Sequence, residues 1–294
     1  MKRAILLFLM LYLVLPLSGV FAFDWQEVHE EADRTDPAAL EKAAGEDLSS
    51  ARMRYLQGLA LLNLHKDSQA KVAFLEAARL DPGVYQARWG TAEVLRRQHD
   101  LKASESLLQA IIKDHPDFAP AYISLAYIRY IQGQYNDAVT LAQTVIAMGR
   151  RNVDLSNYTR AYLILAGSKG MIAHYGGPFS KVVNGTAVFS TLKKAQKLQP
   201  DSPGVLFGLG AYYLLAPKLA GGDLAKAEGY LQGVLKADPL FTDAYVRLAQ
   251  LYRAQGDLSL YEQYLEKALQ IDPGNELALD AKSGNCKYIC PNRD

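Results

Sequence analysis

Histidine and cysteine are the side chains of this protein best suited to chemistry, and their spacing restricts what they could do. None of the five histidines stands in an H-E-x-x-H arrangement, in which two zinc ligands lie one helical turn apart. The chain also lacks a G-x-S-x-G nucleophile elbow and a glycine-rich phosphate loop followed by Lys-Ser/Thr. We therefore predict no catalytic residues, no metal site and no cofactor, and we expect that the protein is not an enzyme.

Two cysteines near the end of the chain, Cys286 and Cys290, leave a choice open. A disulfide between them is permitted in an oxidising compartment if a local turn brings the two Cα atoms to about 4.4–6.8 Å. A structural zinc ion would need four ligands, and no histidine lies near this pair. The spacing therefore leaves a disulfide or two free thiols as the alternatives and disfavours a metal site.

The amino terminus has the pattern of a secretory signal peptide. The basic pair Lys2-Arg3 is followed by an apolar run over 4–17 and by small residues that end at Ala22. An uncleaved membrane anchor is the alternative, but the run is short and contains Pro16. We predict a signal peptide over 1–22 and an exported protein, periplasmic or secreted if the source is bacterial. No stable membrane span is expected after cleavage.

The composition sets limits on size and partners. The 294 residues are half hydrophobic, which is enough for one large domain or for a repeat array with a continuous core. Lysine and arginine number 32 against 31 aspartates and glutamates, so the formal net charge is +1. Nucleic-acid-binding proteins usually carry a basic excess. We therefore expect no nucleic-acid partner.

The segment 242–273 has the spacing of two amphipathic helices joined by a turn. Its first half places Tyr245, Leu248 and Tyr252 on one helical face, and Leu265 lies on the matching face of its second half. An Asp-Pro pair ends the second helix, because proline has no N–H to donate. The segment resembles a tetratricopeptide repeat (TPR), a pattern of about 34 residues. Three further segments follow the same pattern 34 residues apart, and they start at Ala51, Tyr85 and Ala119.

This resemblance implies an all-α fold, a TPR solenoid of stacked antiparallel helix pairs that form a right-handed superhelix. Residues 23–50 are predicted to be a degenerate repeat or cap, and residues 51–273 an array of about six repeats. Residues 274–294 are predicted to be a capping helix and a cysteine-containing tail. The repeat register is lost near 175–185 and 216–221, where glycine and proline indicate loops inserted into turns.

Two smaller features fall between the predicted helices. Residues 151–158 are interpreted as an extra linker. His65 and His99 occupy equivalent repeat positions in turns, and we expect both side chains to be solvated.

In the TPR family the first helix of each pair lines the concave face, and the resemblance carries this role to a stripe of apolar, aromatic and basic residues. An exposed stripe of this kind usually marks a partner site. The residues predicted to contact a partner are Tyr55, Trp89, Arg96, Arg97, Ile123, Tyr127, Tyr130, Phe207, Leu214, Arg247 and Arg253. Some of them could instead pack against the end helices or against the apolar residues predicted to lie in an inserted loop, which are Phe179, Val182 and Val183.

Two functions remain open from the sequence. The first is an exported, non-catalytic scaffold that binds a protein or peptide partner in its concave groove. The second follows from the turn at 216–223, which is similar to the TPR-like T component of tripartite ATP-independent periplasmic (TRAP) transporters. That resemblance implies a periplasmic accessory that binds a small or apolar ligand. The family is commonly lipid-anchored through a cysteine, and no cysteine lies near the predicted cleavage site.

Overall fold

The computed structural model describes residues 24–291, so the predicted signal peptide over 1–22 lies outside the described residues. Helices and short turns make up this part of the chain, and it contains no β-strand. The helices are α1 (Trp25–Arg34), α2 (Pro37–Ala44), α3 (Ala51–Asn63), α4 (Asp67–Leu80), α5 (Gln86–Arg97), α6 (Leu101–Asp114), α7 (Ala119–Ile131), α8 (Tyr135–Met148), α9 (Leu155–Tyr175), α10 (Pro178–Leu198), α11 (Pro203–Leu215), the 3₁₀ turn η1 (Lys218–Ala220), α12 (Leu224–Ala237), α13 (Thr242–Gln255), α14 (Leu258–Ile271) and α15 (Glu276–Ser283).

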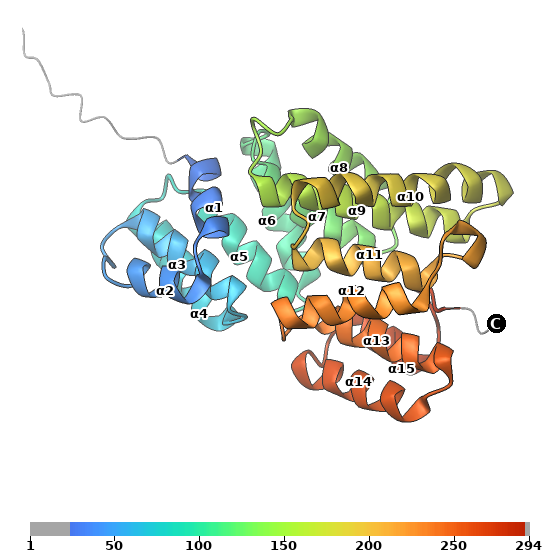
Figure 1. Cartoon of the computed structure of the whole chain (residues 1–294). Helices are drawn as coiled ribbons and strands as arrows, with labels where there is room; N and C mark the ends of the chain where they lie inside the picture. The colour runs from blue at the N-terminus through green and yellow to red at the C-terminus, as the bar shows by residue number, and fades with distance from the viewer. Residues whose placement is uncertain (1–23, 292–294) are drawn as a thin grey trace, which may run out of the picture.

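Successive helices pack against one another from α2 to α15 and form a curved stack (Figure 1). Close packing depends on small residues where helices meet. A Cβ on Gly58 of α3 would lie 2.4 Å from the ring of Phe74 in α4, and a Cβ on Gly90 of α5 would lie 2.5 Å from the same ring. Phe74 is fully buried between these helices. The predicted all-α solenoid of stacked helix pairs is confirmed.

Helix α1 lies against α3 and α9, so it covers the inner side of the first repeats. The Trp25 ring packs edge-on against Phe118, with ring centres 5.2 Å apart. Glu30 accepts a hydrogen bond from Nη2 of Arg150 at 3.1 Å, which ties α1 to the turn before α9. Helix α1 therefore fills part of the concave face that the repeat pattern had left open.

Two equivalent contacts join early turns of the array to late ones. Nε2 of His65, in the turn after α3, lies 3.2 Å from the carboxylate oxygens of Asp238. Nε2 of His99, in the turn after α5, lies 2.9 Å from Oδ1 of Asp272, and its Nδ1 lies 3.1 Å from Oε1 of Glu276. Both His–Asp pairs are separated by 173 residues in the sequence. The array therefore curves until its two halves meet (Figure 1). Contrary to the expectation that they are solvated, His65 and His99 bind the carboxylates of late turns, and we call these two contacts the clasp.

Residues 175–185 differ from the loop that the sequence indicated. Helices α9 and α10 are each 21 residues long, and only Gly176 and Gly177 separate them. Pro178 is the first residue of α10, where its missing N–H would lack a helical partner in any case. The extra residues therefore lengthen both helices of this pair instead of forming a loop.

The predicted linker over 151–158 also ends early. Helix α9 begins at Leu155, and the Asp154 carboxylate caps it by accepting a hydrogen bond from the Asn157 N–H at 2.9 Å. The region 216–221 forms an extended turn that contains η1. None of the described helices is both long and apolar enough to cross a membrane.

Candidate partner-binding cavity

A polar cavity of about 360 Å³ lies where α1, α3, α5 and α9 approach the turn between α12 and α13. Its volume falls in the range of small-ligand sites, roughly 300–1,000 Å³. Aliphatic and aromatic residues, including Leu59, Leu62, Trp89 and Phe241, form part of the wall. Most of the lining is polar or charged, and these residues are His29, Asp33, Asn63, His65, Glu93, Arg96, Arg97, Ser156, Asn157, Arg160 and Asp238.

Glu93 and Arg96 form an ion pair on one face of α5. Their Oε2 and Nη2 atoms lie 3.1 Å apart, and the Glu93 side chain is 6% exposed. The Arg96 guanidinium also lies over the Tyr127 ring, 4.7 Å from its centre. Burial on its own would raise the pKa of Glu93, but the charges of Arg96 and Arg160 outweigh it and hold that pKa at about 2. The carboxylate therefore stays charged and fixes the Arg96 guanidinium in the wall.

Arg97, the next residue, holds the end of α3. Its Nη1 donates to the Leu62 carbonyl at 2.7 Å and lies 3.0 Å from Oδ1 of Asp67. Its Nη2 lies 3.1 Å from Nδ1 of His65. Burial lowers the pKa of Arg97. These contacts position His65 against Asp238 at the mouth of the cavity.

His29 supplies the wall on the α1 side. Its Nε2 lies 2.7 Å from the Tyr55 hydroxyl, and its Nδ1 lies 3.5 Å from Nδ2 of Asn157. Burial lowers the pKa of His29, so the imidazole is neutral near pH 7. Trp89 packs beside it and donates from Nε1 to the Ser124 hydroxyl at 3.0 Å. The His29 imidazole and the Trp89 ring therefore contribute uncharged groups to this wall.

Two side chains of α9 that line the cavity have hydrogen-bonding groups that residues 24–291 leave unused. Asn157 is 4% exposed, and its Nδ2 donates to Asp154 at 2.9 Å, but its Oδ1 accepts no hydrogen bond there. Arg160 forms no hydrogen bond or ion pair with that part of the chain. An unpaired buried acceptor costs about 1–3 kcal/mol. The arrangement therefore suits a ligand that brings a hydrogen-bond donor to Asn157 and negative charge to Arg160.

Asp33 also lines the cavity, although part of the residue reaches solvent. Burial of the carboxyl raises the pKa of Asp33 to about 6, against the opposing effects of a hydrogen bond with Ser156 and the charge of Arg160. Asp33 therefore loses its negative charge as the pH falls below about 6. Below that pH the positive charge of Arg160 is no longer offset by the Asp33 carboxylate.

The tetratricopeptide repeat family model matches residues 55–117, 92–152 and 218–276, which together make up more than half of the chain. The protein belongs to the tetratricopeptide repeat family. No curated protein matches it by sequence.

Solved structures with a similar fold include other TPR proteins. The APC/C hetero-tetramer Cut9–Hcn1 matches with a TM-score of 0.55 and 16% identity, over 87% of this chain and 47% of that chain. The human IFIT1 dimer with PPP-AAAA matches with a TM-score of 0.54 and 19% identity, over 74% and 49% of the two chains. A tetratricopeptide repeat protein from Parabacteroides merdae ATCC 43184 matches with a TM-score of 0.52 and 14% identity, over 87% and 96%. At these identities the likeness concerns the fold alone.

The cavity brings together three of the residues predicted from the TPR pattern, Trp89, Arg96 and Arg97. Tyr127 lies under Arg96 and contributes to the same wall indirectly. Other predicted residues do not line an accessible groove. Tyr55 and Ile123 are fully buried and Leu214 is 4% exposed, and Phe207 packs against Phe241 with ring centres 5.2 Å apart. Neighbouring helices, including α1, cover these side chains, whereas the repeat pattern alone predicts that they are exposed on the concave face.

The chain's own tail covers the opposite end of the TPR groove. Arg247 is 5% exposed and donates to the carbonyls of Tyr288 and Ile289, both at 2.9 Å. The Tyr288 hydroxyl donates to the Ile131 carbonyl at 3.1 Å, and its ring stacks on Tyr130. Arg247 and Tyr130 therefore hold the tail in this structure instead of presenting a free surface.

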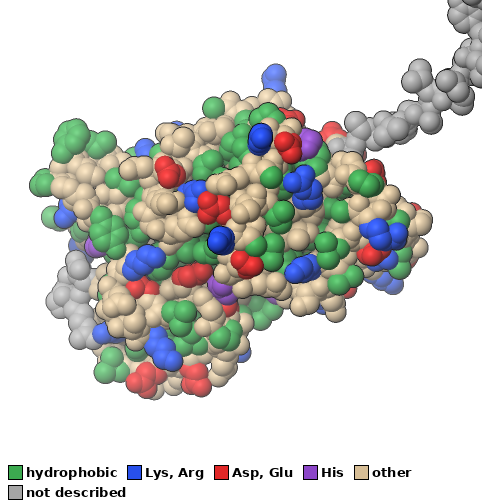
Figure 2. Space-filling model, turned by 180° about the vertical axis from the view of Figure 1, so that it is seen from behind, with side chains coloured by type: hydrophobic (Ala, Val, Ile, Leu, Met, Phe, Trp, Pro, Cys, Tyr) green, Lys and Arg blue, Asp and Glu red, His purple; other side chains and the backbone are tan. Residues whose placement is uncertain are grey.

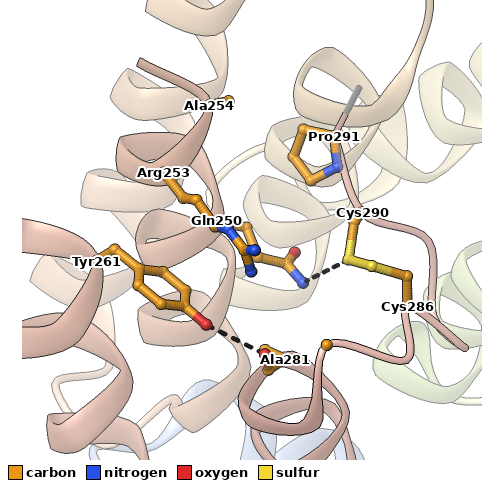
Figure 3. Close-up of a pocket in the computed structure, with 9 residues that line it drawn as sticks. Gln250, Arg253, Ala254, Tyr261, Ala281, Cys286, Cys290 and Pro291 are labelled. Carbon is orange, nitrogen blue, oxygen red and sulfur yellow. Dashed lines mark hydrogen bonds between the residues drawn. A yellow bond between two sulfur atoms is a disulfide. The ribbon is translucent and has the colours of Figure 1, made fainter. Parts of the chain in front are cut away.

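A disulfide between Cys286 and Cys290, with Cα atoms 5.3 Å apart, borders a second cavity of about 170 Å³ (Figure 3). Gln250 points toward the disulfide, with Nε2 3.9 Å from Sγ of Cys290. The predicted residue Arg253 lines the same cavity and lies 5.2 Å from the Tyr261 ring centre. No cluster of three or more His, Cys, Asp or Glu residues in the described part of the chain is placed to hold a metal ion.

Sequence reasoning missed Asn157, Arg160 and Asp238. The repeat pattern places Asn157 in the predicted linker over 151–158 and gives Arg160 no role, because it starts the fourth repeat too late. Asp154 was the available signal, since aspartate is a preferred helix cap and would have started α9 at Leu155. No local signal could have found Asp238, because its partner His65 lies 173 residues away.

Proposed function

We propose that this protein is an exported, non-catalytic scaffold that binds a short peptide segment of a protein partner in its polar central cavity. The TPR fold supports a role in protein interaction. One observation carries the choice of site: Arg160 and Asn157 line one cavity, and neither the Arg160 side chain nor Oδ1 of Asn157 forms a hydrogen bond or a close ion pair with residues 24–291.

A peptide fits this pair of unpaired groups better than an apolar solute does. Its backbone N–H can donate to Asn157, and an acidic side chain or carboxyl terminus can pair with Arg160. The fixed Arg96 and Glu93 beside them would orient the segment. The alternative of a transporter accessory with a small apolar ligand is not favoured, because polar and charged residues form most of the cavity lining.

A capture experiment with matched variants tests this site. The protein would be immobilised and exposed to an envelope extract, and the Arg160→Ala variant would be compared with Arg253→Ala. Both variants remove an arginine from a cavity wall, but Arg253 lines the other cavity. A hydrogen bond to a charged group is worth about 1.5–3 kcal/mol, so Arg160→Ala should weaken capture by about tenfold or more. Equal capture by both variants would refute the site.

Export is a separate part of the proposal and rests on the pattern of residues 1–22. Fractionation of the source cells followed by mass spectrometry of the intact protein tests it. We expect the envelope or secreted fraction to hold a chain that begins at Phe23. A full-length chain confined to the cytoplasmic fraction would contradict export and would leave the cavity proposal standing.

A further inference from the structure

The α9–α10 hairpin ends in a group of exposed apolar side chains that the cavity does not use. Phe179 is 82% exposed, Val182 64% and Val183 50%, and all three lie on one face of the first turns of α10. Tyr175, at the end of α9, is 58% exposed. We call these four residues the hairpin tip. Figure 2 shows hydrophobic side chains gathered at the end of the molecule to which this hairpin extends.

The hairpin tip extends past the neighbouring helix. Phe189 of α10 stacks on Tyr212 near the end of α11, with ring centres 4.9 Å apart. Helix α10 begins at Pro178, which is about three helical turns before Phe189. Neither of the two cavities described above includes a hairpin-tip residue. The tip is therefore an exposed apolar end that lies outside both of these cavities.

The charge of this hairpin is strongly one-sided. Residues 161–200 contain five lysines and no arginine, aspartate or glutamate, although the whole chain is nearly neutral. Lys181 lies between the hairpin-tip residues Phe179 and Val182 in the sequence and is exposed. The turn next to α10 adds Leu219, which is fully exposed. Helix α8 packs against the tip, because the Tyr135 ring stacks on the Tyr175 ring. The first turn of α8 also carries an acidic residue, Asp137.

We propose that the hairpin tip docks on an anionic lipid bilayer. Apolar side chains beside lysines match the surface of such a membrane, in which acyl chains lie directly below negatively charged headgroups. Phe179, Val182 and Val183 enter the boundary between headgroups and acyl chains, and Lys181 extends to the lipid phosphates. A fluid surface needs no shape-complementary pocket, so exposed side chains on one helical face are enough to enter it. The docking would hold the cavity close to the membrane.

Vesicle co-sedimentation tests the docking. The full chain would be mixed with phosphatidylcholine vesicles that either contain or lack phosphatidylglycerol. The test variant is Phe179→Ser with Val182→Ser, and the charge variant is Lys181→Glu. The matched control is Val72→Ser with Leu75→Ser on α4, which removes two exposed apolar side chains at the same spacing from another face. Any contribution from residues 1–23 is the same in every variant.

We expect about tenfold stronger binding to the anionic vesicles than to the neutral ones, and a loss of that order in the Phe179→Ser, Val182→Ser variant. Lys181→Glu should reduce binding several-fold, and the α4 control should bind like wild type. Matching thermal unfolding curves would show that each variant is folded. Vesicle binding that is the same in all variants overturns the proposal.

Two further outcomes would replace the membrane by another occupant. If the hairpin-tip variant abolishes a dimer that forms without lipid, the occupant is a second copy of this chain. If it abolishes binding of a purified protein in the absence of vesicles, the occupant is that protein. The Arg160→Ala variant should bind vesicles like wild type, so failure of the cavity proposal is distinguishable from failure of this one.

Discussion

The contact between His99 and the last repeat should stabilise the protein in a pH-dependent way. The test variant is His99→Asn, which removes the imidazole that contacts Asp272 at 2.9 Å and Glu276 at 3.1 Å. His99 has a φ of 63°, in the left-handed region that asparagine tolerates better than most residues. The substitution therefore deletes the contact without adding backbone strain.

The size and sign of the effect follow from the surroundings of His99. Burial alone would lower the pKa of His99, but the hydrogen bonds to Asp272 and Glu276 outweigh it and raise that pKa. A histidine with a raised pKa in the folded state stabilises fully below its unfolded value of about 6.5, and this contribution is lost as the pH rises through the folded value. The side chains are about 30% exposed, so each ion pair is worth roughly 0.2–1 kcal/mol. Together they should contribute about 1 kcal/mol at acidic pH.

Thermal unfolding of wild type and His99→Asn at pH about 5.5 and about 9 measures this contribution. A loss of about 1 kcal/mol corresponds to a fall in Tm of roughly 2–4 °C for a chain of this size. We expect this difference at the lower pH and almost none at the higher pH. A double-mutant cycle with Glu276→Gln would isolate one of the two pairs. A Tm difference that is equal at both pH values would refute the assignment of a charged clasp.

Three further substitutions test contacts at the clasp, within a helix pair and at the tail. Gly274→Ala places a Cβ 2.5 Å from the His99 ring, so it should lower the Tm in wild type and have a smaller effect in a His99→Gly background, measured by thermal unfolding. Gly58→Ala places a Cβ 2.4 Å from the Phe74 ring and should cost about 1–3 kcal/mol in urea unfolding, because both helices would have to move. Arg247→Met removes the hydrogen bonds to the tail, so trypsin should cleave after Lys287 about tenfold faster while global unfolding changes less. Unchanged cleavage would show that Arg247 does not hold the tail.

The repeat fold was predictable because its determinants are local. Small residues recur at 34-residue intervals where helices meet, and so do prolines after the second helix, at 82 and 116 and again at 239 and 273. Each fixes a contact or a helix end within one pair or with the next. Gly58 illustrates this, because a side chain at this position would clash with the ring of Phe74, which lies only 16 residues later in the sequence. Periodicity therefore identified the helices, although it placed the start of α9 too late and interpreted the extended α9–α10 hairpin as a loop.

The candidate site was predictable only in part because its geometry depends on distant segments. Trp89, Arg96 and Arg97 follow from their repeat positions and do line the cavity. The repeat pattern does not specify that α1 folds back into the groove, nor that the tail reaches the Ile131 carbonyl from 157 residues away. These end segments bury positions such as Tyr55, and the space left between them becomes the polar cavity. Its unpaired groups could be recognised only after the fold was closed.

Site-specific photo-crosslinking tests the central claim, that the polar cavity binds a peptide segment of the partner. A photoreactive residue would replace Asn63, an exposed residue in the cavity lining, and in a control it would replace Val72, an exposed residue of α4 outside the cavity. We predict that a partner peptide becomes attached at position 63 but not at position 72, that mass spectrometry finds an acidic side chain or carboxyl terminus in it, and that Arg160→Ala abolishes the adduct. Equal labelling at both positions, or an adduct that persists without Arg160, would contradict the account.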